Sequence, residues 1–546
     1  MNYIIFRLLL ILGMFLSIGC SSSEPSGENP IQGELIKSFS VTVEGGVANG
    51  IIDNTGKTIT LNGISNGNQI TDVDVVLSDG VSIFPDPVSF IGNWDAEEKI
   101  QIKYEDISLT YTIILADYNK KSNIISVNPM SKRQKIEFVG GDMERSQFFM
   151  QKALDPQVVA NWCFKDVPFD ICRVSYDKKQ EETEGQKNMS FYDDAIKSMK
   201  NLKIANPDIK FWATMKSDYN GYNDQNNLPD WICDYAPTTR FDCDKYAVFL
   251  ADYLEHMEDN GVRISYLATS KEWVGVITAE RAKKIIEKLN SECEKRNIKK
   301  PLYVDPASWG ISQGVEFIKS ASSIGSLELY YGFSTHNLNG NESEKLIYEK
   351  FVTEANKYGK FAFADETSTG AGGRTNGEEP TDLTGLIEAY MEKAEFYKDG
   401  IQGELFFEIF SRGVNAETRS VYFTNGGTPK RMRSYYVMKS FVEGICGGTH
   451  YVEPTHTSVD SCIKSMAFVD EEKAFLVVLN NGEDIVKNLG VSLVGEYPKA
   501  NVEKMVCYDI NGPIEGSEIN NVEFFNNTLM TDVPAKSLTF VTINYK

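Results

Sequence analysis

The sequence lacks the motifs that would build a metal or phosphate site. Its nine cysteines include no close Cys-x-x-Cys pair, so a zinc site is not expected. No glycine-rich phosphate loop is present, and no acidic run has the spacing of a calcium-binding EF-hand loop. Basic residues are outnumbered by acidic ones. The chain has 55 Lys and Arg and 77 Asp and Glu, which gives a formal net charge of −22. We therefore expect no metal and no cofactor, and no nucleic acid or anionic membrane surface as a partner, since phosphate groups attract Lys and Arg.

The amino terminus lacks an apolar run long enough to cross a bilayer comfortably. A positive charge, an apolar run over residues 8–18 and Gly19-Cys20 instead form the pattern of a signal peptide over residues 1–20. The last five residues, Leu-Ser-Ile-Gly-Cys20, resemble a bacterial lipoprotein processing site, which predicts lipidation of Cys20; secretion with cleavage nearby is the alternative. Residues 21–35 are rich in Ser, Pro and Gly and are expected to be a flexible tether. We predict a lipid anchor and an outer-membrane or cell-surface protein, with a periplasm-facing position as the alternative.

The chain has 546 residues, too many for one ordinary domain, and its apolar pattern changes twice. Short strands with alternating apolar and polar residues occupy residues 36–118 and again residues 445–546, and each stretch predicts an antiparallel β-sandwich. The first resembles the immunoglobulin-like modules behind the lipid anchor of Bacteroidetes surface proteins. We interpret it as a spacer, with direct glycan binding as the alternative. The apolar run near residues 122–130 has no partner of its own, so we expect it to join the second sandwich.

Between the two sandwiches, over residues 131–440, short apolar runs alternate with amphipathic helices. A buried parallel strand is a nearly continuous apolar run, and eight such runs can be traced. Eight strand–helix units in about 300 residues is the expected size of a (β/α)8 TIM barrel. A doubly wound open sheet is the alternative, although no phosphate loop supports it. The runs lie at residues 135–139, 169–174, 209–214, 264–269, 301–304, 329–333, 360–364 and 403–407.

Two of these apolar runs end abruptly in a glutamate. Glu272 closes the fourth and Glu366 closes the seventh. The carboxyl ends of barrel strands converge on one face, where barrel enzymes hold their chemistry. Two facing carboxylates are what retaining glycoside hydrolysis requires, with Glu366 as the nucleophile and Glu272 as the general acid and base. Some of the 77 acids must follow strands by chance, but two of them at strands four and seven of a traceable barrel predict a catalytic pair.

Other side chains near the predicted strand ends are candidates for substrate binding. Arg173 is charged within an apolar run, and a buried arginine needs a carboxylate, for which Glu366 is the natural partner; a structural salt bridge elsewhere is the alternative. His336, one of only four histidines, follows run six and is expected to hold a sugar hydroxyl or to orient Glu366. Aromatic faces stack on sugar rings, although core packing is the commoner use of a single tryptophan. The remaining candidates are Trp212, Trp231, Trp273, Trp309, Asp142, Asp218 and Glu408.

Over about residues 125–546 the chain resembles family 30 of the glycoside hydrolases, in clan A. The resemblance implies a (β/α)8 barrel with an attached β-sandwich, retaining chemistry and β-linked glycan substrates, with the proton donor on Glu272 and the nucleophile on Glu366. The segments that carry it are Phe138-Val-Gly-Gly-Asp-Met-Glu-Arg-Ser146, Ile171-Cys-Arg-Val-Ser-Tyr-Asp177, Lys271-Glu-Trp273, His336, Asp365-Glu-Thr367, Tyr435-Tyr-Val-Met-Lys-Ser-Phe441 and Val533-Pro-Ala-Lys-Ser-Leu-Thr-Phe-Val541.

The sequence departs from that family at strand four. Clan A enzymes usually carry Asn-Glu-Pro there, and that Asn binds the 2-hydroxyl of the sugar, whereas this chain has Ser270-Lys-Glu-Trp273. Lys271 is then a candidate donor to substrate, or the mark of a glycan bearing a carboxylate or sulfate, or the mark of a barrel that binds without cutting.

We therefore predict a retaining β-glycosidase that acts as a monomer on a poly- or oligosaccharide. The alternative is a non-catalytic, glycan-binding lipoprotein on a degenerate glycosidase barrel, and the third hypothesis is a structural or adhesive surface protein. Cys233 and Cys243 are expected either to form a disulfide bond or to remain thiols.

Overall fold

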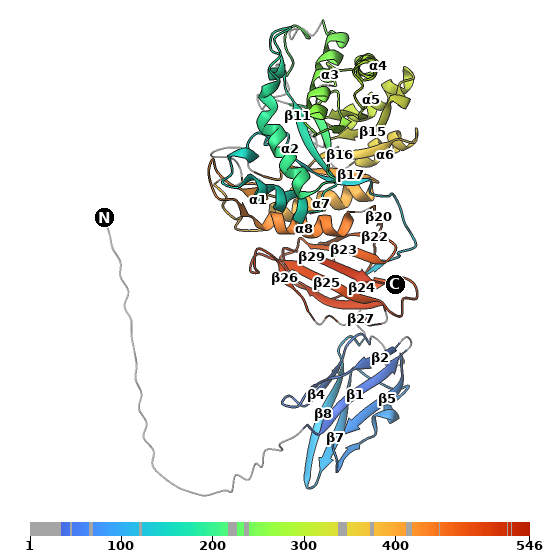
Figure 1. Cartoon of the computed structure of the whole chain (residues 1–546). Coiled ribbons are helices and arrows are strands. Elements are labelled where there is room, and N and C mark those ends of the chain that lie inside the picture. The colour runs from blue at the N-terminus through green and yellow to red at the C-terminus, as the bar shows by residue number, and fades with distance from the viewer. Residues whose placement is uncertain are drawn as a thin grey trace, which may run out of the picture. The chain divides into compact units, whose positions relative to one another are not determined.

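The computed structural model divides into two compact units, Met1–Tyr118 and Asn119–Lys546 (Figure 1). The predicted signal peptide with Cys20, and the candidates Asp218 and Trp273, lie outside the described residues. Within the described part of the chain, no helix combines the length and the hydropathy needed to span a bilayer. The structure describes residues 34–43, 46–64, 69–118, 123–216, 227–233, 240–272, 274–336, 347–371, 376–410, 418–446, 448–520, 522, 524–525 and 527–546.

The first unit is built from two β-sheets, as the alternating pattern predicted. One sheet has the order β2-β1-β5 and the other β3-β4-β8-β7-β6. Alternate residues of these strands, among them Phe39, Ile59 and Ile100, are buried and form the core between the sheets. The strands are β1 (Ile36–Val43), β2 (Gly46–Asn49), β3 (Ile51–Asp53), β4 (Thr58–Leu61), β5 (Ile70–Leu77), β6 (Val81–Phe84), β7 (Glu97–Tyr104) and β8 (Ile107–Leu115).

The second unit begins with a closed barrel of eight parallel strands, which confirms the predicted TIM barrel. The strands follow one another in sequence order, and the barrel closes where Phe138 of the first pairs with Gly403 of the last. They are β10 (Phe138–Asp142), β11 (Ile171–Tyr176), β12 (Lys210–Met215), β13 (Ile264–Leu267), β14 (Leu302–Ser308), β15 (Tyr330–Thr335), β16 (Phe361–Ser368) and β17 (Gly403–Phe407).

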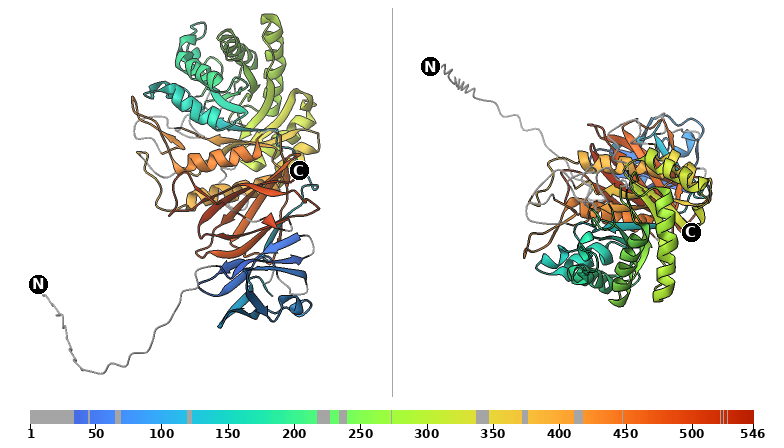
Figure 2. Two further views of the ribbon diagram at one scale, coloured as in Figure 1. Left: turned by 60° about the horizontal axis from the view of Figure 1, so that its bottom comes forward. Right: turned by 90° about the horizontal axis from the view of Figure 1, so that it is seen from above.

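Helices lie outside these strands, as the green and yellow ribbons of Figure 2 show. Local signals place their ends. Asp242 and Thr278 accept backbone hydrogen bonds as N-caps of α3 and α4, and Asn297 ends α4 with a left-handed φ of 58°. The helices are α1 (Pro156–Asn161), α2 (Asp193–Ala205), α3 (Cys243–Asp259), α4 (Ala279–Arg296), α5 (Ile311–Ser323), α6 (Tyr348–Asn356), α7 (Thr384–Lys398) and α8 (Arg433–Ile445).

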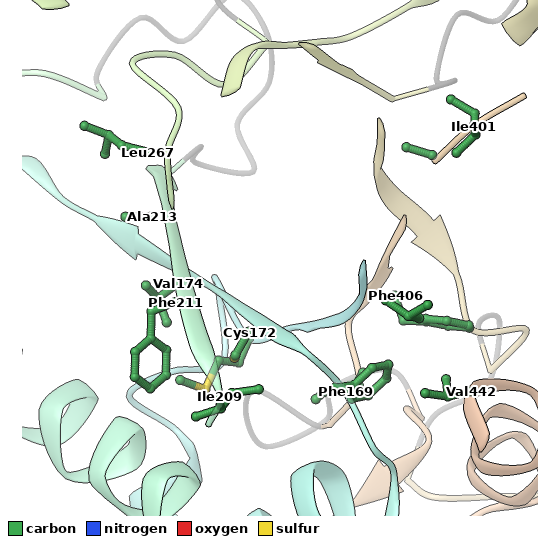
Figure 3. Packing of buried hydrophobic residues seen from close by; sticks show 14 of the residues in the cluster. Phe169, Cys172, Val174, Ile209, Phe211, Ala213, Leu267, Ile401, Phe406 and Val442 are labelled. Carbon is green, nitrogen blue, oxygen red and sulfur yellow. The ribbon is translucent and has the colours of Figure 1, made fainter. Parts of the chain in front are cut away.

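Alternation along the strands separates the inside of the barrel from the layer beneath the helices. Cys172 and Val174 of β11 pack with Phe211 in the helix-facing core (Figure 3). Ile171 belongs to a separate cluster inside the barrel, so Arg173, two residues on, points inward as well. That inner cluster also holds Trp212, Phe138, Tyr266, Val304, Phe363 and Leu405. The prediction that Trp212 lies at a strand end is wrong, because Trp212 fills the barrel interior below the strand ends.

The chain ends in a second β-sandwich. Its five-stranded sheet has the order β21-β9-β24-β28-β27, so the run at Ile124–Val127 pairs with strands far along the chain. Its six-stranded sheet, β20-β22-β23-β29-β25-β26, contacts α8, which lies along it in Figure 1. The strands are β9 (Ile124–Val127), β20 (His450–Val452), β21 (Thr455–Thr457), β22 (Ile463–Val469), β23 (Lys473–Asn480), β24 (Val486–Leu493), β25 (Asn501–Tyr508), β26 (Ser517–Glu518), β27 (Phe524–Phe525), β28 (Thr528–Val533) and β29 (Ser537–Asn544). A two-stranded ribbon, β18 (Val421–Tyr422) with β19 (Lys430–Arg431), precedes α8, and Cys233 and Cys243 are free thiols.

One buried ion pair fixes α7 to the barrel wall. Lys393 Nζ lies 2.5 Å from Glu404 Oε2, and the hydroxyls of Thr367 and Tyr397 donate to the same carboxylate at 2.6 and 2.8 Å. Both charged side chains are almost fully buried, at 1% and 0% exposure. Breaking such a pair by removing one partner leaves a charge without compensation in the protein interior.

We therefore expect Lys393→Met to lower the free energy of unfolding by about 3 kcal/mol, measured by urea denaturation. The matched control is Lys398→Met on the same helix, because Lys398 is 54% exposed and lies 3.9 Å from Glu453. An exposed pair of this kind contributes less than about 1 kcal/mol. Equal losses in the two variants would show that burial of the Lys393–Glu404 pair does not matter for stability.

Candidate active site

The charged residues predicted from strand ends meet at the carboxyl face of the barrel, because the strands are parallel and the barrel is closed. Arg173 comes from β11, and Lys271 and Glu272 from the segment that follows β13. His336 comes directly after β15, and Glu366 lies near the end of β16. Residues that are up to 193 positions apart in sequence are thereby brought into direct contact.

Glu272 and Glu366 face each other across His336. One carboxylate oxygen of each glutamate and one ring nitrogen of the histidine lie within 4.8 Å of one another. His336 Nε2 is 3.3 Å from Glu272 Oε1 and 2.9 Å from Glu366 Oε2. Carboxyl groups about 5–5.5 Å apart are typical of retaining glycosidases, whereas inverting enzymes need about 6.5–9.5 Å. The spacing is compatible with direct attack by one carboxylate and proton donation by the other.

Three cations surround Glu366. Arg173 Nη2 donates to its Oε1 at 2.9 Å, Lys271 Nζ contacts the same oxygen at 3.3 Å, and His336 approaches the other oxygen. Burial by itself would raise the pKa of Glu366, but the charges of His336, Lys271 and Arg173 outweigh it and hold that pKa well below the usual range. Glu366 is therefore ionised, which a nucleophile requires.

His336 is fixed in orientation by the strand beside it. Its Nδ1 lies 2.8 Å from Asp365 Oδ1, and Ser334 Oγ donates to the other oxygen of Asp365 at 2.9 Å. Burial alone would lower the pKa of His336, but Glu366 and Asp365 raise it well above its ordinary value. Burial would raise the pKa of Asp365, and His336 and Arg173 reverse that effect and lower it. The ring is thus an imidazolium ion that faces both glutamates.

Two further carboxylates, from the end of β10 and the loop after it, balance the cations. Asp142 accepts a hydrogen bond from Arg173 Nε, and Glu144 Oε2 lies 2.8 Å from Lys271 Nζ. Glu144 and Lys271 are both fully buried. Burial lowers the pKa of Lys271, and the negative charges of Glu144 and Glu366 raise it above its ordinary value. Lys271 is therefore an ammonium ion held between two acids. Glu144 was not among the predicted site residues, although it stands in the segment after the first predicted strand.

Phe407, the last residue of β17, lies among the cations of the site. Lys271 Nζ and Arg173 Cζ are 5.6 and 5.9 Å from its ring centroid, and Arg145 and Arg419 approach to 5.1 and 5.8 Å. These distances are in the range of cation–π interactions. The candidate Glu408, which follows Phe407, is buried and ion-pairs with Arg419 at 3.2 Å.

Of the predicted tryptophans that the structure describes, Trp231 packs against a helix of the barrel. The Trp231 indole N–H donates to the carbonyl of Glu181 at 2.9 Å, and its ring packs against Phe249 of α3. Trp309 is half-buried directly after β14. For Trp231, none of the contacts within the described residues reaches Glu272 or Glu366.

Glu272, His336 and Glu366 are also spaced closely enough to hold a metal ion. A cation bound there would lie beside two others, because Arg173 Nη2 and Lys271 Nζ are already 2.9 and 3.3 Å from Glu366 Oε1. The arrangement suits proton transfer and charge stabilisation better than metal binding.

Comparisons with known proteins agree with the barrel and its sandwich. Residues 3–127 match the model of a domain of unknown function, DUF4971. No curated protein matched the chain. Among solved structures, the family 30, subfamily 8 xylanase of Clostridium acetobutylicum is 17% identical with a TM-score of 0.57, over 78% of this chain and all of that one.

Two other solved structures are similar in the same region. The catalytic domain of a family 30 xylanase from Talaromyces cellulolyticus is 14% identical with a TM-score of 0.59, over 77% of this chain and 99% of that one. An endo-β-1,6-glucanase is 16% identical with a TM-score of 0.54, over 77% of this chain and 94% of that one. At these identities the likeness concerns the fold, and the larger unit of this chain has the fold of solved family 30 glycoside hydrolases.

Proposed function

We propose that this protein is a retaining β-glycosidase that hydrolyses a β-linked glycan. The observation that carries the proposal is the short spacing between Glu272 and an ionised Glu366 at the carboxyl face of the barrel. Glu366 attacks the anomeric carbon, and Glu272 donates a proton to the leaving glycosidic oxygen. Glu272 then takes a proton from the water that hydrolyses the glycosyl-enzyme intermediate.

The surrounding cations give the two glutamates different roles. Arg173 and Lys271 contact one oxygen of Glu366, so this carboxylate stays charged and its position is fixed before substrate arrives. His336 lies between the two carboxylates and is oriented by Asp365. Proximity and orientation supply much of the rate enhancement of such sites.

Incubation of the protein with a panel of polysaccharides tests this function. The panel includes xylan and a β-1,6-glucan, because similar structures carry the names of a xylanase and an endo-β-1,6-glucanase. New reducing ends should appear with the wild type and with Glu349→Gln, an exposed control position on α6, but not with Glu366→Gln. The first product should keep the β-configuration in proton NMR spectra.

The non-catalytic alternative gives a different result in the same experiment. If the wild type is retarded by a glycan in affinity electrophoresis yet releases nothing from any member of the panel, the barrel binds without cutting. We expect the protein to elute as a monomer in size-exclusion chromatography.

We also propose that Cys20 carries a lipid anchor that holds the protein at the cell surface. The pattern of residues 1–20 supports this proposal. Labelled palmitate should be incorporated into the wild type expressed in a bacterium and not into Cys20→Ser. Labelling of both proteins, or of neither, contradicts it.

Lys271→Met should move the acid limb of the kcat/KM profile to higher pH. Lys271 helps to hold the pKa of Glu366 down, so its removal raises that pKa and protonates the nucleophile earlier as the pH falls. In the wild type the limb should lie below about 4.3, the value of an ordinary glutamate. Activity at the optimum should fall about 10- to 100-fold, because Glu366 also loses a contact that positions it.

The double variant Lys271→Met/Glu144→Gln is the matched control for charge. It removes the buried acid that Lys271 neutralises, so it should unfold at a higher temperature than Lys271→Met alone. An acid limb that stays in place in Lys271→Met would show that Lys271 does not act on Glu366.

A further inference from the structure

The segment that leads from β13 to Glu272 is held by side chains from several other elements. Hydroxyl groups donate to three successive carbonyls: Tyr176 to Ala268 at 3.0 Å, Tyr246 to Thr269 at 2.7 Å and Thr214 to Ser270 at 3.3 Å. These donors come from β11, α3 and β12. The backbone leading to the catalytic glutamate is therefore fixed from one side by a row of hydroxyls.

On the other side, β14 supplies the partner for the N–H groups of the same segment. Asp305 is fully buried, and its Oδ1 accepts the Thr269 N–H at 2.8 Å. The Thr269 hydroxyl lies 3.1 and 3.0 Å from the two oxygens of this carboxylate. Two residues along β14, the carbonyl of Ala307 accepts the N–H of Glu272 itself at 2.8 Å. The strand thus binds both ends of the short segment from Thr269 to Glu272.

Glu272 needs this support because of its backbone conformation. Its φ is +62°, in the left-handed region that non-glycine residues adopt rarely. Backbone strain of this kind persists only where surrounding contacts fix it. Glu366, on β16, is held by a different set of groups, namely Arg173, His336 and Lys271.

We propose that Asp305 is the positioning residue for the acid/base Glu272, acting through Thr269 and the backbone that follows it. This inference rests on the proposed function. The contacts recorded for Asp305 within the described residues are to the segment and not to either glutamate, so it orients the proton donor without touching substrate. Burial raises the pKa of Asp305 to about 7, and the hydrogen bonds from Thr269 and Ser270 oppose that rise.

Leaving-group dependence tests the proposal, because only poor leaving groups need a proton from Glu272. Asp305→Asn keeps the shape of the side chain but has one acceptor oxygen instead of two. The probes are the phenyl and 2,4-dinitrophenyl β-glycosides of xylose and glucose. We expect kcat/KM for the phenyl glycosides to fall about 10- to 100-fold and kcat/KM for the dinitrophenyl glycosides to stay within about threefold of the wild type, because kcat/KM reports the step in which the leaving group departs. Equal losses for both leaving groups would overturn the proposal.

Thr269 provides the conservative variants on the other side of the contact. Thr269→Ser keeps the hydroxyl that meets Asp305 and should retain the wild-type leaving-group dependence. Thr269→Val removes it and should shift the dependence in the same direction as Asp305→Asn, by a smaller factor. If Asp305→Asn does not fold, this pair still decides the question, because identical behaviour of the two Thr269 variants contradicts the proposal.

Hydrogen exchange separates the failure of this inference from the failure of the proposed function. Backbone amides in residues 268–272 should exchange at least about tenfold faster in Asp305→Asn than in the wild type, while those of β16, residues 361–368, should not change. This measurement needs no turnover. If the wild type releases new reducing ends from no member of the polysaccharide panel, the proposed function fails, whereas unchanged exchange over residues 268–272 overturns the positioning role itself.

Discussion

Exchange of Glu366 for glutamine should lower kcat by at least about 10⁴-fold on any glycan that the wild type cleaves, a loss of the size seen when a nucleophile is removed. The amide has the same shape as the carboxylate but cannot form the glycosyl-enzyme bond. The thermal unfolding temperature of each variant shows whether the fold survives. A variant that keeps even one hundredth of the activity would exclude Glu366 as the nucleophile.

Glu272→Ala should behave differently, and the contrast assigns the two roles. Its kcat/KM should fall about 10²- to 10⁴-fold for natural glycans and much less for a dinitrophenyl glycoside, because dinitrophenolate leaves without a proton. Azide ion should then accelerate the reaction, because a small anion attacks the intermediate without a general base. The glycosyl azide from Glu272→Ala should have the β-configuration, since Glu366 still forms the intermediate. An α-azide from this variant would reverse the two assignments.

Much of the fold could be predicted because each strand of the barrel is a short apolar run between amphipathic helices. Parallel strands buried on both faces leave this pattern whatever the substrate. The pattern does not say how deep in the barrel a residue lies. Trp212 was expected at a strand end for that reason, and it instead fills the interior beside Phe138. The run at Ile124–Val127 could be recognised as a strand, but its partner β24 lies more than 350 residues further on.

The candidate site could be predicted where a charge interrupts or ends an apolar run. Arg173, Glu272 and Glu366 carry that signal. The residues that pair with them show this sequence signal weakly or not at all. Glu144 stands among other polar residues, and its pairing with Lys271 exists only because the closed barrel brings the carboxyl ends of β10 and β13 to the same face.

Sequence also does not reveal residues that position the site without contacting substrate. Asp305 follows an apolar run as Glu366 does, yet its carboxylate turns toward Thr269 and the neighbouring segment. Sequence alone shows a carboxylate at a strand end, and only the packing decides whether it faces substrate or the backbone. The sequence likewise does not distinguish Tyr176 and Tyr246, whose hydroxyls hold the segment, from ordinary core tyrosines.

Apart from the two glutamates, Arg173 should be the position where substitution lowers stability and activity most. Its guanidinium donates to Asp142 through Nε and to Glu366 through Nη2, and its Nη1 lies 3.8 Å from Asp365. Arg173→Met would leave three carboxylates in a buried site without this cation, so we expect the free energy of unfolding to fall by about 5 kcal/mol.

Arg173→Lys tests whether the charge of Arg173 is enough to prepare Glu366, or whether the planar guanidinium group with its two directed contacts is needed. A lysine keeps the charge, but a single ammonium group does not reproduce the two directed contacts. We expect kcat to fall about 10²- to 10³-fold in Arg173→Lys, with an acid limb at higher pH, because Arg173 is one of the groups that hold down the pKa of Glu366. The control is Arg296→Lys on α4. It changes an arginine that also ion-pairs with three acids, Asp252, Glu255 and Glu292, and it should leave activity unchanged. If Arg173→Lys retains full activity, charge alone holds Glu366, and the directional contacts have no part in preparing the nucleophile.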